Sequence, residues 1–126
     1  QAILVYQAQS QDLAGTSWVA TGYNNGKQAV TSVMAGTRIT ADFGKGILSG
    51  NSGCNDYNGS YTASGGQIKI GPMASTMKTC AAPTGIMDQE TQYLAALGSA
   101  ATYDIQGTKL ELRTQDGALA VTYIKK

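Results

Sequence analysis

The sequence predicts a mainly β protein that contains a single helix. Sixteen glycines, seven tyrosines and many threonine and serine residues favour short strands joined by tight turns. Only one stretch of the chain has apolar residues at helical spacing. At 126 residues the chain is long enough for one domain with a hydrophobic core, and too short for two.

The charge of the chain argues against several kinds of partner. Its net charge is +1 and only 13% of its residues are charged, so we expect no nucleic-acid partner. The longest apolar runs, such as residues 2–6, are too short for a transmembrane segment. Low charge with abundant Thr, Ser, Asn, Gln and Gly is common in extracytoplasmic proteins, which is where we expect this one.

The predicted strands alternate apolar and polar residues, and Gly- or Asn-containing turns separate them. In chain order they cover residues 3–7, 17–23, 37–43, 47–50, 60–63, 67–70, 102–105, 109–113 and 119–124. Residues 44–46 and 64–66 are Gly-rich and predict two hairpins. Residues 72–78 are expected to form another strand or an extended segment.

The predicted helix runs from about residue 84 to residue 97. Its apolar stripe, interrupted only at Glu90, consists of Ile86, Met87, Tyr93, Leu94 and Leu97. Thr84 is the expected N-cap, Asp88 suits the first turn, and Gly98 is a natural stop.

An internal echo bears on domain organisation. Residues 2–6 (AILVY) resemble residues 118–123 (ALAVTY), which are predicted to form the last strand. Residues 1–10 are therefore expected to be a strand or tail, and one interpretation makes them the end of a preceding, similar domain. Residues 11–126 form the predicted domain.

The sequence offers little for catalysis. It has no histidine, which removes Ser-His and Cys-His pairs and most zinc sites. Ser75 and Lys78 satisfy a bare Ser-x-x-Lys pattern, but they lack companion motifs and fall in a predicted strand. The Asn- and Asp-rich run at residues 51–58 favours Asx turns over a calcium loop, because the closing Glu is absent. We expect no enzyme, cofactor or metal.

Cys54 and Cys80 are the only cysteines and lie 26 positions apart. They allow one disulfide, which would indicate an oxidising compartment, or two buried free thiols.

Four motifs in order carry a resemblance to a known family. They are Leu13-x-Gly15-Thr16-x-Trp18, Gly53-Cys54-Asn55-x-Tyr57-x-Gly59-x-Tyr61, Ser75-Thr76-Met77-x-x-Cys80 and Met87-Asp88-x-Glu90-x-x-Tyr93-Leu94-x-x-Leu97. Together they resemble the META domain, also called the heat-shock protein HslJ family, over residues 13 to about 124.

The resemblance implies a strongly bent antiparallel sheet or partial barrel, lipocalin-like in topology, with one helix packed on it. It also implies a structural disulfide between Cys54 and Cys80, with Trp18 in the core and Gly53 at the bend. Asn55, Tyr57 and Thr76 complete the structural motif. The family includes secreted proteins and lipoproteins of bacteria, sometimes with tandem copies, and is loosely tied to envelope stress; no catalytic site is established for it.

The leading functional hypothesis is therefore a non-enzymatic interaction module of the cell envelope or exterior, with an unknown protein partner. A lipocalin-like carrier of a small apolar ligand is an alternative, which large side chains in the interior would count against. An endopeptidase inhibitor is another, with residues 24–35 and 81–85 as its candidate loops.

Overall fold

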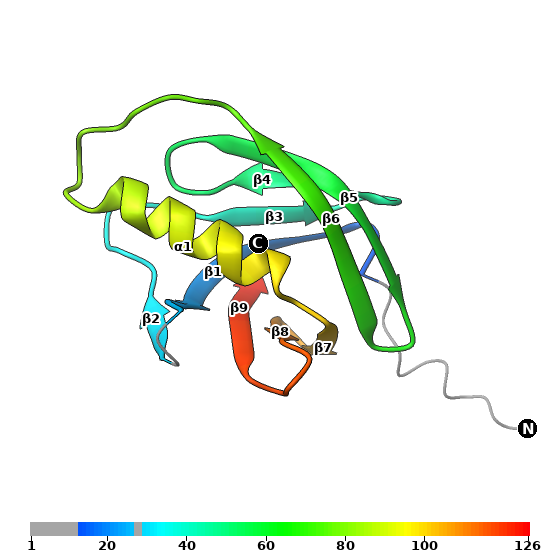
Figure 1. The fold of residues 1–126 in the computed structure, drawn as a ribbon. Coiled ribbons are helices and arrows are strands. Elements are labelled where there is room, and N and C mark those ends of the chain that lie inside the picture. The colour runs from blue at the N-terminus through cyan, green and yellow to red at the C-terminus, as the bar shows by residue number, and fades with distance from the viewer. Residues whose placement is uncertain (1–12, 27–28) are drawn as a thin grey trace, which may run out of the picture.

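A computed structural model of the chain describes residues 13–26 and 29–126 (Figure 1). The predicted strand at residues 3–7, and with it the question of a preceding domain, lies outside the described residues. The elements in chain order are β1 (Thr16–Asn24), β2 (Val30–Ser32), β3 (Thr40–Phe43), β4 (Ile47–Asn51), β5 (Asp56–Ser64), β6 (Gln67–Ser75), α1 (Ile86–Gly98), β7 (Thr102–Gln106), β8 (Lys109–Arg113) and β9 (Leu119–Lys125).

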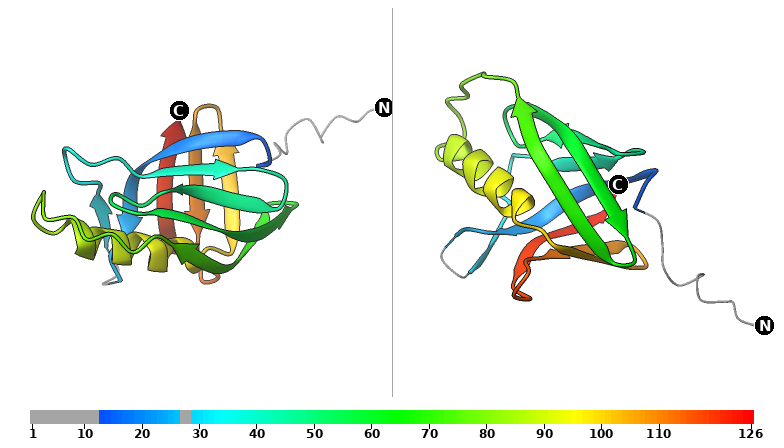
Figure 2. Two further views of the ribbon diagram at one scale, coloured as in Figure 1. Left: turned by 90° about the horizontal axis from the view of Figure 1, so that it is seen from above. Right: turned by 45° about the vertical axis from the view of Figure 1, so that its right-hand side comes forward.

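The strands form one antiparallel sheet, as predicted. In the described part of the chain its order is β2-β1-β3-β4-β5-β6-β7-β8-β9, and β1 also pairs with β9. This additional pairing bends the sheet round into a ring, and α1 lies along one opening of the ring (Figure 2). The predicted fold class, a mainly β protein with a strongly curved sheet and one packed helix, is confirmed.

The ring has one weakly closed side, between β6 and β7. A single residue pair, Gln67 with Thr102, joins these two strands in the ladder. Beyond that pair β6 runs away from β7, and α1 occupies the space on that side (Figures 1 and 2). The helix contacts β1, β9 and β6.

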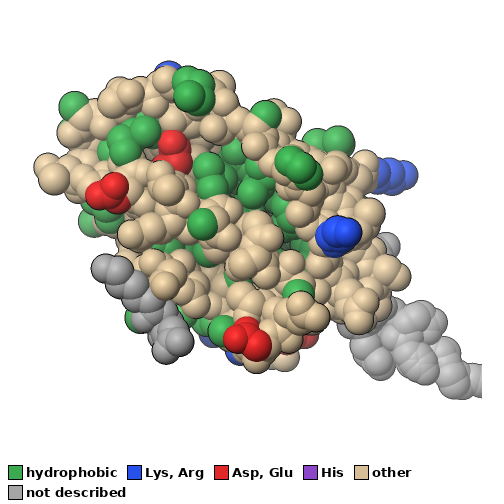
Figure 3. Space-filling model, viewed as in Figure 1, with side chains coloured by type: hydrophobic (Ala, Val, Ile, Leu, Met, Phe, Trp, Pro, Cys, Tyr) green, Lys and Arg blue, Asp and Glu red, His purple; other side chains and the backbone are tan. Residues whose placement is uncertain are grey.

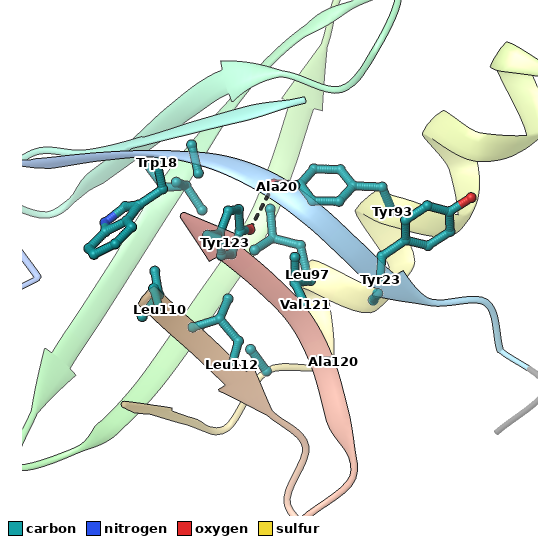
Figure 4. Close-up of a cluster of buried hydrophobic side chains, with 14 of the residues drawn as sticks. Trp18, Ala20, Tyr23, Tyr93, Leu97, Leu110, Leu112, Ala120, Val121 and Tyr123 are labelled. Carbon is teal, nitrogen blue, oxygen red and sulfur yellow. Dashed lines mark hydrogen bonds between the residues drawn. The ribbon is translucent and has the colours of Figure 1, made fainter. Parts of the chain in front are cut away.

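Large side chains fill the interior of the ring. The largest fully buried ones include Trp18, Phe43, Tyr57, Tyr93 and Tyr123. Figure 4 shows part of this core, where the hydroxyl groups of Tyr93 and Tyr123 meet. An interior filled in this way counts against the carrier hypothesis, since a carrier needs an empty cavity.

Buried tyrosines bring polar groups into the core, and these groups bond to one another. The hydroxyls of Tyr123 and Tyr93 are 2.8 Å apart, as are those of Tyr93 and Tyr57. Tyr57 then donates to the Thr40 carbonyl at 2.7 Å. Burial raises the pKa of all three tyrosines, so they remain neutral hydrogen-bonding groups.

The helix starts later than predicted, and the assignment of Thr84 as its N-cap is wrong. Gly85 is the N-cap, with φ of 91°, and no side chain caps the helix. Glycine reaches this left-handed conformation without a steric penalty, so the chain turns into the helix at Gly85 and leaves Thr84 exposed. At the other end, Gly98 is the last helical residue and Ser99 is the C-cap.

The hairpin of β5 and β6 is longer than predicted. The sequence indicated residues 60–63 and 67–70, whereas the strands continue to Asp56 and Ser75 at the open end. The ladder shifts register between Gly59 and Tyr61. An extra residue on β6 at this bulge disrupts the alternation that sequence patterns rely on. Residues 72–75 thus belong to β6, and the chain leaves the sheet after them.

Candidate interaction site

The turn between β4 and β5, residues 52–55, is the base of the candidate site. The Asn51 side chain accepts a hydrogen bond from the Gly53 N–H at 2.8 Å, which is an Asx turn as the sequence analysis favoured. The Ser52 N–H donates to the Asn55 carbonyl at 2.9 Å, and Ser52 Oγ lies 3.0 Å from the same carbonyl oxygen. Gly53 has φ of 114°, a backbone conformation that residues other than glycine rarely adopt.

Glu90 from α1 lies beneath this turn and binds it. Its Oε1 accepts hydrogen bonds from Ser52 Oγ at 2.7 Å, from the Cys54 N–H at 3.2 Å and from the Asn55 N–H at 2.7 Å. Its Oε2 accepts one from Asn55 Nδ2 at 2.7 Å. Burial raises the pKa of Glu90, but these four donors outweigh it and hold the pKa below its usual value.

The Asn55 side chain also binds the segment that follows β6. Its Oδ1 accepts hydrogen bonds from the Lys78 N–H and from Thr76 Oγ1, both at 2.7 Å. Its Nδ2 donates to the Lys78 carbonyl at 3.0 Å, besides its bond to Glu90. Both backbone groups of Lys78 are therefore held by one buried side chain, as a neighbouring strand would hold them.

A disulfide between Cys54 and Cys80 fixes the same segment at a second point. The bond joins the β4–β5 turn to the chain just before the helix, as the family resemblance implied. It closes a loop of about 27 residues, for which chain entropy gives about 3.5 kcal/mol of stabilisation.

The segment that these contacts hold is itself exposed. Residues 76–79 are all exposed, and Met77 is 91% exposed, the most of the exposed large hydrophobic side chains in the described residues. We call residues 76–80 the tethered segment. Its backbone is tied to a buried network while an apolar side chain points into solvent.

The residues predicted from the motifs divide into two places. Gly53, Cys54, Asn55, Thr76 and Cys80 come together at the tethered segment. Tyr57, two residues after Asn55 on β5, is buried in the core. Trp18 lies in the core on β1, where its Nε1 donates to Thr16 Oγ1 at 2.7 Å.

Two helix residues of this region were missed by the sequence analysis. Glu90 was taken as a break in the apolar stripe, yet it is buried and joins helix to turn. Gln89 is also buried; it accepts from the Met34 N–H at 2.7 Å and donates to Thr37 Oγ1 at 3.1 Å. The sequence showed only that polar residues stand at these helix positions; it did not show which groups they would bind.

The described residues contain no group of His, Cys, Asp or Glu able to hold a metal ion. Among the helices of that same part of the chain, none has the length and apolarity to cross a membrane. Ser75 and Lys78 are both exposed, Ser75 at the end of β6 and Lys78 in the tethered segment.

The described residues form a small β domain with a curved antiparallel sheet and one packed helix. A disulfide and a buried Asn–Glu network hold its tethered segment. The chain belongs to the META domain family, whose model matches residues 11–126.

Two solved structures are similar to the chain. An NMR structure of a protein from Burkholderia xenovorans is 27% identical, with a TM-score of 0.75, over 100% of this chain and 94% of that one. A second NMR structure is 23% identical, with a TM-score of 0.64, over 97% of this chain and 96% of that one, and supports the fold alone. No curated protein matches the chain.

Proposed function

We propose that this chain is a non-catalytic, extracytoplasmic protein-interaction module that binds its partner at the tethered segment. The observation that carries the proposal is that residues 76–80 are fixed by Asn55 and by the disulfide while Met77 is 91% exposed. Leaving a methionine side chain in water forgoes about 1.5–3 kcal/mol of burial, which a partner's surface could recover.

Preorganisation supports the same proposal. A loop that is already ordered loses less conformational entropy on binding than a flexible one, so more of the contact energy appears as affinity. Here one buried side chain holds both backbone groups of Lys78, and a covalent bond holds Cys80. Methionine is also an adaptable contact residue at protein interfaces.

The disulfide supports the location in this proposal, because such bonds persist in oxidising compartments. The bacterial envelope or exterior, with a link to envelope stress, is what the family resemblance implies. The absence of histidine in the sequence supports a role other than catalysis, since it removes the commonest general base.

A photo-crosslinking amino acid at position 77 tests the proposal in the producing cells. A matched variant carries it at position 47, because Ile47 is also an exposed apolar residue (55%) but lies on β4. We expect a protein adduct from position 77 that position 47 does not give. Adducts that are absent, or equal at both positions, would contradict the proposal.

The same observation favours one specific kind of partner as a second candidate, an endopeptidase. Residues 81–82 and 84–85 are exposed and directly follow the disulfide-bonded Cys80, as a presented loop would. In that case the adduct at position 77 would contain a protease, and the purified domain would inhibit it.

A further inference from the structure

Strand β6 has a long unpaired edge. It pairs with β5 along its length, but with β7 only through Gln67 and Thr102. No other described strand pairs with residues 68–75, and no turn or loop backbone bond reaches their outer edge except that from Ile68 N–H to the Ala101 carbonyl. An open row of backbone donors and acceptors is the template on which another strand can add.

The direction of the backbone groups follows from the ladder. The Ile68 N–H points towards β7, so by strand alternation Ile70 faces the same way. Beyond the bulge, the Thr76 N–H bonds to the Asp56 carbonyl and faces β5, so Met73 and Ser75 face outwards. The open edge thus offers N–H and C=O groups at Ile70, Met73 and Ser75, with Pro72 between them.

Apolar side chains lie beside this edge. Ile70 and Met73 on β6 and Leu94 on α1 are each half-buried and pack against the core. Met73 also reaches the end of α1, its methyl group lying 3.9 Å from where a Cβ on Gly98 would be. Figure 3 shows hydrophobic side chains gathered in the hollow between α1 and β6. A strand added here would lay alternate side chains on this surface.

The charged side chains of β6 and of the tethered segment are both lysines, while Asp56 lies on β5, on the side of β6 away from the open edge. From Tyr57 to Met87 the chain carries Lys69 and Lys78 and no Asp or Glu. Both lysines are exposed, and neither belongs to an ion pair within the described residues. They are nine positions apart, one on β6 and one in the tethered segment that continues it. A segment lying along β6 would meet one positive charge near each end.

We infer that the open edge of β6 binds an extended peptide segment of the partner by strand addition, one with alternating apolar residues and acidic residues at its ends. This inference rests on the proposed function and extends it from the tethered segment to residues 68–75. The backbone groups of Ile70, Met73 and Ser75 supply the hydrogen bonds, and Ile70, Met73 and Leu94 receive the apolar side chains.

Another open edge of the described sheet, besides the edge of β7 that faces β6, serves as an internal comparison. Strand β2 pairs only with β1 but has three residues, Val30–Ser32. A strand this short offers too few backbone groups for stable addition.

The test is NMR titration of the isotope-labelled domain with a synthetic peptide. The peptide has seven alternating valine and threonine residues flanked by two glutamates at each end, and a second version has lysines in place of the glutamates. We expect slowed amide exchange at Ile70, Met73 and Ser75, unchanged exchange at Val30–Ser32, and affinity about tenfold higher for the glutamate version.

Charge-reversed variants provide the matched control. The pair Lys69→Glu and Lys78→Glu should reverse the preference for the glutamate peptide. The pair Lys45→Glu and Lys109→Glu makes the same change of net charge at exposed lysines elsewhere and should leave it unchanged.

Three results would overturn the inference: no protection on β6, protection centred elsewhere, or protection that appears without peptide together with a dimer in sedimentation. The last result would assign the edge to a second copy of the chain. Failure of these titrations with a persisting adduct at position 77 would leave the proposed function standing and remove only strand addition.

Discussion

Glu90 is the residue on which the candidate site depends. It places a carboxylate at a position that the apolar stripe of α1 would otherwise fill, and the side chain is only 6% exposed. Burying a charge is costly unless hydrogen bonds compensate, and four donors from Ser52, Cys54 and Asn55 do so. Two of those four are backbone N–H groups, so the carboxylate fixes the course of the turn itself.

Replacing Glu90 by glutamine should lower the free energy of unfolding at pH 7 by about 3 kcal/mol. The amide nitrogen of glutamine would face a donor, Asn55 Nδ2 or the turn N–H groups. Denaturant unfolding measures the change. The matched variant Glu111→Gln removes a surface carboxylate that is 3.2 Å from Arg113 and should cost less than about 1 kcal/mol. Equal losses in the two variants would contradict this account.

The pKa of Glu90 predicts a pH dependence as well. Because folding lowers that pKa, its stabilisation is present above the unfolded value, about 4.3, and is lost as pH falls through the folded value. The difference in unfolding free energy between the wild-type chain and Glu90→Gln should therefore shrink below about pH 4. A difference independent of pH down to pH 2 would show that the charge is not what stabilises the turn.

At the scale of elements, most strand positions could be predicted but their ends could not, and β2 (Val30–Ser32) was missed because it lies in a stretch predicted to be a loop. Strand β8 alternates buried and more exposed residues, and local pattern alone places it. The start of α1 depends on the backbone angle φ of Gly85. The length of β6 depends on a bulge in its ladder with β5. Glu90 could not be placed either, because its partners come from a turn 35 or more residues away. Local sequence patterns do not contain such long-range contacts.

The disulfide and Asn55 hold the tethered segment at two points, Cys80 and Lys78, and a variant can separate their contributions to stability. The double variant Cys54→Ala and Cys80→Ala should lose about 3.5 kcal/mol of unfolding free energy. It should keep the fold, with amide exchange faster in residues 80–85 than at Lys78, whose N–H still bonds to Asn55. Hydrogen exchange of the variant, and of the reduced wild-type chain, provides the measurement. Equal loss of protection at Lys78 and at residue 82 would show that the hydrogen bonds depend on the disulfide.

On the scale of the whole molecule, β1 closes the fold. It pairs with β3 through Thr16–Val19, with β9 through Trp18–Tyr23 and with β2 at its end. These pairings join the first described strand to the last in one ladder. On the opposite side of the ring, β6 and β7 are joined only near their ends, by the pair Gln67 and Thr102 and by the backbone bonds from Ile68 to Ala101 and from Tyr103 to Gly66. The ladder of the ring is therefore continuous where β1 meets β9 and is interrupted between β6 and β7.

Closure by β1 also sets where the domain should begin. The family match starts at residue 11, and the first described contacts are those of Leu13, which is 2% exposed, and of the Gly15 N–H with the Phe43 carbonyl. We propose that residues 1–10 lie outside this domain.

A chain of residues 11–126 should then unfold within about 0.5 kcal/mol of the full chain in denaturant. A chain of residues 16–126, which also lacks the buried Leu13, should lose about 3 kcal/mol, because it leaves a cavity in the core beside β1. If the first truncation costs as much as the second, residues 1–10 are part of this fold. If neither truncation costs stability, Leu13 does not close the core, and the boundary lies further along the chain, within β1.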